Sequence, residues 1–327
     1  MKKIHIITTG GTISAQKNEA KSIDLGKVSM ENLFGQLQIP ADHELVFHDI
    51  AAIDSSLMTF EILYQITTRI HTIFQDTESC GVIVTHGTDT LEESAYFLSL
   101  CYPQHEERPV IITGSQRSAN ELGSDALANI QHALWAVCSP AAHNLGVVVL
   151  FNQALLLPKY VHKFHTYFLH AFQTAQYGML GTVDNGKVSI VQYPAKQEHF
   201  TLRKFPFEKI DIYKASLNCS GAILKFYSEL GYQGIIIEAF GRGNVTEELA
   251  KNIKELVNSG CYVIITSDCT SGSVAPLYNF SGGLPKLIEY GAIPAFEYSA
   301  KKARIKLAVL LASGITDKNE IAEHFQE

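Results

Sequence analysis

The sequence predicts an α/β protein of two domains: a larger N-terminal domain whose mostly parallel sheet carries helices on both faces, and a smaller C-terminal α/β domain. Short, wholly apolar runs such as Val82–Val84 and Gly146–Phe151 are typical of strands buried on both faces. Helical stretches alternate with these strands, which favours parallel pairing through right-handed crossovers. At 327 residues, the chain is longer than a usual single domain, so two domains are expected.

The expected elements of the first domain follow in chain order. Strands are predicted at 4–8, 45–47, 82–84, 110–112 and 146–151, and helices at about 57–74, after residue 90, and at 125–137. From 152 to 177 the periodicity weakens. Asp184-Asn185-Gly186-Lys187 is a strong signal for a hairpin turn. We therefore expect the first domain to comprise residues 1–190.

The second domain repeats this alternation on a smaller scale. A polar stretch that contains Pro194 and Pro206 indicates an interdomain linker, residues 191–209. After it, strands are predicted at 234–237 and 262–265 with a helix at 247–258 between them, and further helices near 285–290, 303–311 and 318–325. The second domain is therefore expected at 210–327.

Composition restricts the class of partner and the compartment. The net charge of −7 and the absence of a basic block argue against a nucleic-acid partner, and the apolar runs are too short to span a membrane. Few apolar residues separate Met1-Lys2-Lys3 from the first glycine turn, too few for a signal-peptide core. The six cysteines are scattered, which indicates free thiols and no metal site. We expect a cytoplasmic protein.

One strand-to-helix turn places polar groups where ligands bind in α/β proteins. The apolar strand 82–84 ends at His86-Gly87-Thr88-Asp89, and a helix is expected to begin at Thr90, which has capping-box spacing to Glu93. Backbone N–H groups and the positive end of a helix dipole converge at such a turn. The carboxyl ends of strands in open α/β sheets are the usual ligand sites.

A second turn of the same design lies near the amino terminus. The strand 4–8 is followed by Thr9-Gly10-Gly11-Thr12, in which two adjacent glycines allow a tight turn and close approach to a ligand. Thr12 is carried on the loop beyond them. Either turn alone is typical of an ordinary tight connection, with Thr90 as a helix cap. Together they supply two hydroxyl groups on two βα turns.

These two motifs closely resemble the signatures of the bacterial-type L-asparaginases. The matching segments are Thr9-Gly10-Gly11-Thr12-Ile13 and His86-Gly87-Thr88-Asp89-Thr90-Leu91-Glu92-Glu93. Resemblance continues along almost the whole chain, at 54–58, 113–117, 238–245 and 301–307. It implies an amidohydrolase that converts L-asparagine and water to L-aspartate and ammonia, with glutamine as a minor substrate and without a cofactor.

The resemblance also implies a catalytic group. An amide is a poor electrophile, so hydrolysis without a metal needs a nucleophile, a base and donors for the oxyanion. Thr12 is implied as the nucleophile that forms an acyl-enzyme, and Thr88, Asp89 and Lys163 as the relay that activates it or the hydrolytic water. Which threonine attacks first is left open. Taken by itself, Lys163 is typical of a solvated surface charge.

The substrate-binding residues implied by the resemblance lie on the same turns. Asp54 and Ser55 would hold the α-amino and α-carboxylate groups, although Asp-Ser-Ser is also typical of a helix cap. Gly11, Gly87 and Ser115 would complete the pocket.

The polar stretch 15–27 is expected to form a lid. Commoner family members carry a tyrosine there, and its place falls at or beside Ile23 in this chain. Isoleucine cannot hydrogen-bond a nucleophile, so Tyr278 is our candidate for the missing phenol; the alternative is a half-buried core tyrosine.

Two other functions stay open at this point. The chain could be the asparaginase-like subunit of an amidotransferase, but such subunits carry an extra N-terminal domain, whereas here the first motif begins almost at Met1. It could also be a non-catalytic amino-acid-binding protein on the same scaffold, because fold does not fix function. The resemblance further implies a homo-oligomer, a dimer or tetramer, in which a neighbouring subunit's smaller domain completes each active site.

Overall fold

The chain forms two compact units, residues 1–199 and 200–327, in a computed structural model. The structure describes residues 1–14, 16–17, 23–24, 29–195, 197–205 and 209–326. The division between the units falls inside the stretch 191–209 that the sequence predicts as a linker.

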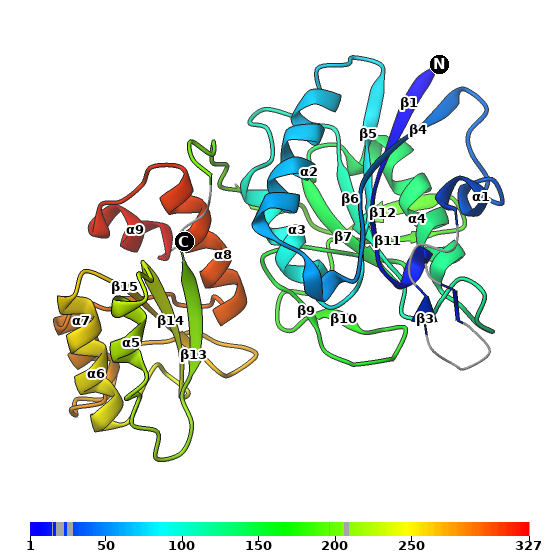
Figure 1. Ribbon diagram of the computed structural model, residues 1–327. Helices are drawn as coiled ribbons and strands as arrows, with labels where there is room; N and C mark the ends of the chain where they lie inside the picture. Colours follow the sequence, from blue (N-terminus) through cyan, green and yellow to red (C-terminus); the bar gives the residue numbers. More distant parts are fainter. Residues whose placement is uncertain (15, 18–22, 25–28, 196, 206–208, 327) are drawn as a thin grey trace. The chain divides into compact units, whose positions relative to one another are not determined.

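The larger unit is built on an eight-stranded sheet of order β12-β11-β8-β7-β6-β5-β1-β4 (Figure 1). The strands are β1 (Lys2–Gly10), β4 (His43–Ile53), β5 (Ser79–Thr85), β6 (Val110–Thr113), β7 (Val147–Phe151), β8 (Ala154–Leu156), β11 (Gly181–Asp184) and β12 (Lys187–Ile190). From β4 to β7 all neighbours are parallel, whereas β8, β11 and β12 are joined antiparallel. The α/β class is confirmed, and the sheet is mixed.

Helices cover both faces of this sheet. They are α1 (Met30–Phe34), α2 (Phe60–Ile73), α3 (Leu91–Leu100) and α4 (Ala126–Cys138). Figure 1 shows α2 and α3 on one side of the strands, and α4 with α1 on the other. Val82, Ile83 and Val84 are all fully buried, because alternate side chains of β5 meet opposite layers of helix. This explains why the strand has no polar face.

Two pairs of short strands lie outside the main sheet. β9 (Val161–Lys163) and β10 (Phe172–Thr174) pair antiparallel, as do β2 (Gln16–Lys17) and β3 (Ile23–Asp24). The first pair falls in the stretch where the sequence periodicity weakens.

The helix caps correct two sequence predictions. Thr59 caps α2 by accepting the Ile62 N–H, and Asp54 instead caps a separate 3-10 turn, Ser55–Leu57. Thr90 does not form the expected capping box at α3. Its ψ of 10° is far from the extended backbone of a capping residue, and its hydroxyl donates to the Ser55 carbonyl oxygen at 2.6 Å.

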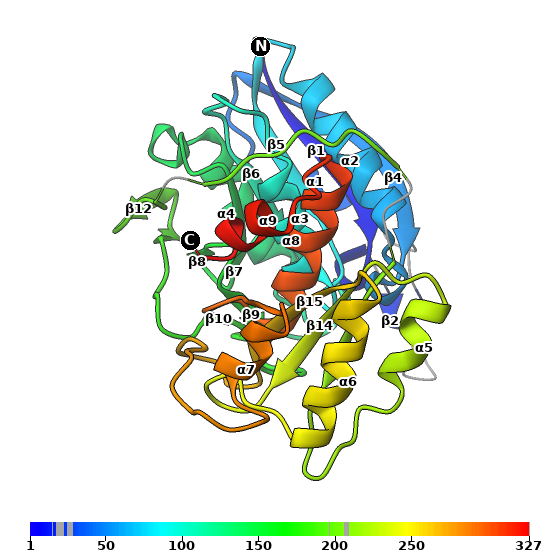
Figure 2. The same ribbon diagram turned by 90° about the vertical axis from the view of Figure 1, so that its left-hand side faces the viewer.

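The smaller unit has a four-stranded, wholly parallel sheet of order β13-β14-β15-β16. Its elements are β13 (Ile210–Lys214), α5 (Leu224–Glu229), β14 (Gly234–Ala239), α6 (Glu247–Asn258), β15 (Tyr262–Ser267), α7 (Leu284–Glu289), β16 (Ile293–Pro294), α8 (Ala300–Ala312) and α9 (Lys318–His324). α5, α6 and α7 pack together, and α8 packs against β13, β14 and β15 (Figure 2). Across the described ranges of the chain, no helix is both long enough and apolar enough to span a membrane.

Candidate functional site

The two glycine-containing turns touch each other at the carboxyl edge of the larger sheet. β1 and β5 are parallel neighbours, with Thr8 opposite Thr85. Beyond them, Gly11 has a φ of +81°, and a Cβ atom placed on it would lie 2.4 Å from the Gly87 Cα atom. Only glycine can occupy this contact, because the left-handed backbone and the missing side chain are both required. The two motifs are therefore one structural site.

A third turn, after β4, packs into the same place. Ser55 is buried, its Oγ accepts the Asp89 N–H at 3.1 Å, and a Cβ atom on Gly87 would lie 2.7 Å from that Oγ. The Ser55 hydroxyl proton can still be donated, because in this bond the oxygen is the acceptor. A carboxylate placed here could accept that proton.

Asp54 brings a negative charge beside this turn. Its carboxylate accepts hydrogen bonds from the Ser56 hydroxyl at 2.6 Å and the Ser56 N–H at 2.9 Å. These bonds hold the pKa of Asp54 below its usual range, and the charge of Lys163 lowers it further. Asp54 is therefore an ionised carboxylate at neutral pH, which can bind an ammonium group.

The structure joins the three residues of the predicted relay. Lys163, the last residue of β9, places its Nζ 2.8 Å from the Thr88 Oγ1 and 2.6 Å from the Asp89 Oδ1. Thr88 is buried, and the Lys163 side chain is only 17 % exposed, whereas Asp89 is 60 % exposed. Lys163 is thus not the solvated surface charge that its residue type suggests. One amine contacts both a hydroxyl and a carboxylate, which is an arrangement suited to proton transfer.

Sequence reasoning overlooked a buried carboxylate next to this group. Glu92, in the first turn of α3, is 3 % exposed, and its Oε2 accepts the backbone N–H of Lys163 at 3.0 Å. The same oxygen is 3.4 Å from the His162 Nδ1. No local signal could have found it, because an acidic residue in the first turn of a helix is expected for the helix dipole alone.

His86 holds the carbonyl group of Gly87, in the turn after β5, through a hydrogen bond. It is 1 % exposed, and its Nδ1–H donates to the Gly87 carbonyl oxygen at 2.7 Å. Burial lowers the pKa of His86 to about 4, so the ring is neutral at physiological pH. This neutral ring is the tautomer with the proton on Nδ1.

Ser115 follows β6, the neighbour of β5 in the sheet. Its hydroxyl donates to the Arg117 carbonyl oxygen at 2.8 Å. The loop is held by Asp125, which accepts the N–H groups of Gln116 and Arg117. A substrate contact for Ser115 stays a prediction.

The predicted lid and its candidate phenol belong to two different parts of the chain. Most of the stretch 15–27, and the side chain of Ile23, lie outside the described residues. Tyr278 belongs to the smaller unit, where it is 52 % exposed. Its catalytic role stays a prediction.

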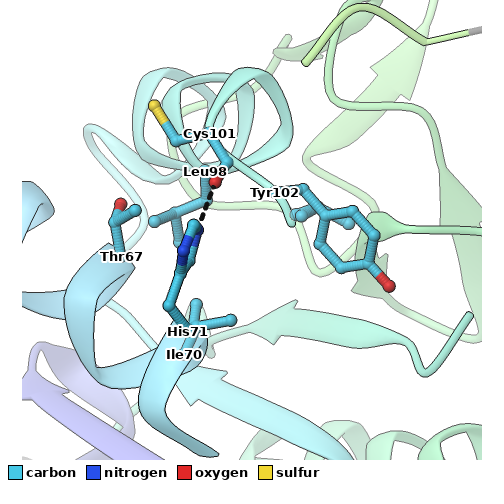
Figure 3. Close-up of a pocket in the computed structure, with 7 residues that line it drawn as sticks. Thr67, Ile70, His71, Leu98, Cys101 and Tyr102 are labelled. Carbon is cyan, nitrogen blue, oxygen red and sulfur yellow. Dashed lines mark hydrogen bonds between the residues drawn. The ribbon is translucent and has the colours of Figure 1, made fainter. Parts of the chain in front are cut away.

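A pocket at the opposite edge of the sheet is unrelated to these turns. It lies between α2 and the end of α3, near the start of β7, and is lined by Thr67, Ile70, His71, Leu98, Cys101, Tyr102 and Val147. Figure 3 shows the His71 ring crossing it to donate to the Cys101 carbonyl oxygen at 2.9 Å. Ligands in α/β sheets bind at the carboxyl ends of strands, and this pocket lies at an amino end.

Among the described side chains, no group of three or more His, Cys, Asp or Glu could hold a metal ion.

Comparison with known proteins places this geometry in a family. Residues 3–196 match the family model "Asparaginase, N-terminal", and residues 209–325 match "Glutaminase/Asparaginase C-terminal domain". The chain is 39 % identical to an L-asparaginase of Bacillus licheniformis over 97 % of this chain and 98 % of that protein. It is 27 % identical to L-asparaginase 2 of Escherichia coli strain K12, over 99 % and 92 % of the two chains.

A solved structure is similar over the full length. The crystal structure of a probable cytoplasmic L-asparaginase from Campylobacter jejuni superimposes with a TM-score of 0.88 at 29 % identity and covers 100 % of both chains. The chain therefore belongs to the asparaginase family.

Proposed function

We propose that this asparaginase-family enzyme hydrolyses L-asparagine to L-aspartate and ammonia through a threonine nucleophile, with glutamine as a minor substrate. The observation that carries the proposal is the position of the Lys163 Nζ, 2.8 Å from the Thr88 hydroxyl and 2.6 Å from the Asp89 carboxylate. Thr88 and Asp89 follow Gly87, whose backbone contacts Gly11. An amine between a hydroxyl and a carboxylate supplies the base that amide hydrolysis requires.

Substrate binding uses the third turn. The ionised carboxylate of Asp54 binds the α-ammonium group of asparagine, and the free proton of the Ser55 hydroxyl is donated to the α-carboxylate. The close contact of Gly11 with Gly87 keeps the two turns together beside the substrate, and Ser115 approaches from β6. These contacts orient the side-chain amide toward the turns that carry the hydroxyl groups.

The Thr12 Oγ attacks the amide carbon, and its proton passes to the relay. The C–N bond of the tetrahedral intermediate then breaks, a proton goes to the leaving nitrogen, and ammonia departs. An ester between Thr12 and the β-carboxyl of aspartate remains. Backbone N–H groups of the strand-to-helix turns stabilise the oxyanion.

Water completes the reaction. The relay of Thr88 and Lys163 takes up a proton from a water molecule, which attacks the ester carbon, and the relay returns a proton to the Thr12 oxygen as the ester bond breaks. Asp89 holds the lysine in place during this transfer. Hydrolysis of the ester releases L-aspartate and restores the Thr12 hydroxyl.

The active form is proposed to be a cytoplasmic homo-oligomer, a dimer or tetramer. All six cysteines are free, which supports a reducing compartment. Large aromatic side chains lie exposed after β9, Tyr167 at 68 % and Phe168 at 53 %, as at surfaces that bind protein. Light scattering of the purified protein and cell fractionation test these two proposals.

The catalytic proposal is tested with Thr12→Ala. Purified wild-type protein should release ammonia from asparagine, and the variant should lose turnover while its melting temperature and its asparagine affinity, measured by calorimetry, stay near wild type. Only one hydroxyl group is removed, so binding should survive. Near wild-type turnover in the variant would refute Thr12 as the nucleophile. Binding without ammonia release by the wild type would instead indicate an amino-acid-binding protein.

A further inference from the structure

We propose that Glu92 is a positioning residue, which sets the distance between the Lys163 amine and the Thr88 hydroxyl by holding the backbone of Lys163. This rests on the proposed function, in which Lys163 serves the relay.

The strand that carries Lys163 belongs to a separate pair that packs on the main sheet through side chains, with the Phe172 ring centroid 4.7 Å from that of Phe151 in β7. β9 has three residues and, among the described strands, pairs only with β10, in a separate two-stranded sheet. Lys163 is at its end, opposite Phe172. A two-stranded pair is marginally stable in isolation. Side-chain packing places the pair on the sheet, and a hydrogen bond from β9 to α3 can set the finer distance between Lys163 and Thr88.

Glu92 provides that tie. Its Oε2 accepts the Lys163 N–H at 3.0 Å, and the carboxylate is 3 % exposed. Breaking this bond would leave the Lys163 N–H or the buried Glu92 oxygen without its partner away from water, which is costly.

The tie closes a ring of contacts around the relay. Thr88 and Asp89 lie just before Thr90, the residue that precedes α3, and Glu92 lies in the first turn of the helix. From Glu92 the ring continues to the Lys163 N–H and returns from the Lys163 Nζ to Thr88 and Asp89. Both ends of the lysine are thus bound to one short segment. The His162 Nδ1, 3.4 Å from the same Oε2, adds a second contact from β9.

Length and functional group of the side chain can be separated by two substitutions. Glu92→Gln keeps the length and an oxygen that accepts the Lys163 N–H, but replaces the carboxyl group by an amide. Glu92→Asp keeps the carboxyl group but withdraws it by one methylene, which breaks the bond or pulls β9 toward α3. If the distance is what matters, the glutamine variant should retain activity and the aspartate variant should lose it.

The experiment measures kcat and KM for asparagine together with melting temperature. For Glu92→Asp we expect kcat to fall about 10- to 100-fold, because a shift of about 1 Å in a catalytic group costs roughly this much. KM should stay within about threefold, since Asp54 and Ser55 are untouched. Glu92→Gln should keep kcat within about fivefold of wild type. Glu93→Asp and Glu93→Gln, at the next position of α3, serve as matched controls and should leave both constants unchanged.

A cycle with Lys163→Met tests whether Glu92 acts through the lysine. Adding Glu92→Asp to Lys163→Met should not lower the residual kcat further, whereas independent, multiplicative losses would overturn the proposal. So would wild-type kcat in Glu92→Asp, or a glutamine variant that is as impaired as the aspartate variant. If the wild-type protein releases no ammonia from asparagine, the proposed function itself is wrong. If the wild type is active and only the expected effects of the Glu92 variants are absent, the inference about Glu92 is wrong.

Discussion

Replacing Gly11 by alanine tests directly whether the contact between the two turns sets the catalytic geometry. The added Cβ would lie 2.4 Å from the Gly87 Cα and 2.5 Å from the Gly87 N. Carbon atoms without a bond approach to about 3.5–4.0 Å. One turn must therefore move by roughly 1 Å, and because both contacts are with backbone, no side-chain rotation can relieve them.

The magnitude follows from two separate costs. The left-handed backbone of Gly11, with φ +81°, costs an alanine about 1–2 kcal/mol, and the overlap adds about 1–3 kcal/mol. The displaced turn carries Thr12, and a misplacement of about 1 Å lowers kcat by about 100-fold. We expect Gly11→Ala to lose both stability and turnover.

A matched control separates the backbone strain from the overlap. Gly260 has a φ of +89°, and a Cβ atom there would meet nothing within 4 Å. Gly260→Ala should therefore lose about 1–2 kcal/mol with unchanged kcat. The assays are ammonia release and urea unfolding. If Gly11→Ala keeps kcat within about threefold of wild type, the contact between the turns does not control the chemistry.

Three further predictions concern the relay, the phenol and the buried histidine. Lys163→Met should lower kcat by about 10²–10⁴-fold, as for loss of a general base. Adding Thr88→Val should lower kcat little further, because the effects of residues that act as one unit are not additive. If steady-state kinetics show that the two losses multiply, the relay is contradicted. Tyr278→Phe should lower kcat far more than melting temperature, whereas Ile23→Ala should mainly raise KM; a kinetically silent Tyr278→Phe would exclude its role. Burial lowers the pKa of His86 to about 4, below the value of about 6.5 in an unfolded chain, so the unfolded state binds more protons between these values. The contribution of the neutral His86 ring to stability is complete above pH 6.5 and is lost as the pH falls toward 4. In His86→Gln the melting temperature should therefore decline less steeply over this range. An identical decline in wild type and variant would show that His86 is not a buried, neutral histidine.

Much of the fold could be predicted because burial on both faces leaves a simple pattern. β5 and β7 were expected as apolar runs, and α6 was expected at the residues where it occurs, 247–258. The Asp184–Lys187 hairpin is confirmed: Asn185 and Gly186 have φ values of 46° and 77°, which the turn type requires. Family and enzyme class are confirmed by the comparisons.

Details at the ends of elements could not be predicted, because tertiary partners compete for the same groups. Thr90 and Glu93 have the spacing of a capping box, but the Thr90 hydroxyl bonds to Ser55, which is 35 residues away in sequence. Likewise Glu92 has the residue type and position of a helix-dipole partner, and its burial against Lys163 follows only from the placement of β9.

The same distinction explains which site residues could be predicted to converge. Gly11 and Gly87 follow adjacent parallel strands, and Ser55 follows the next one, β4. The carboxyl ends of parallel strands lie at one edge of a sheet. Once the strands are predicted from the sequence, the turns that follow them can be predicted to meet. Lys163 arrives by another route, on a short antiparallel pair beyond β8. No periodicity marks that path, and only the family resemblance pointed to this lysine. The residue on which the proposed proton transfer depends is thus held by individual hydrogen bonds rather than by the sheet, and for this reason we expect activity to be lost through small changes near β9 that leave the fold intact.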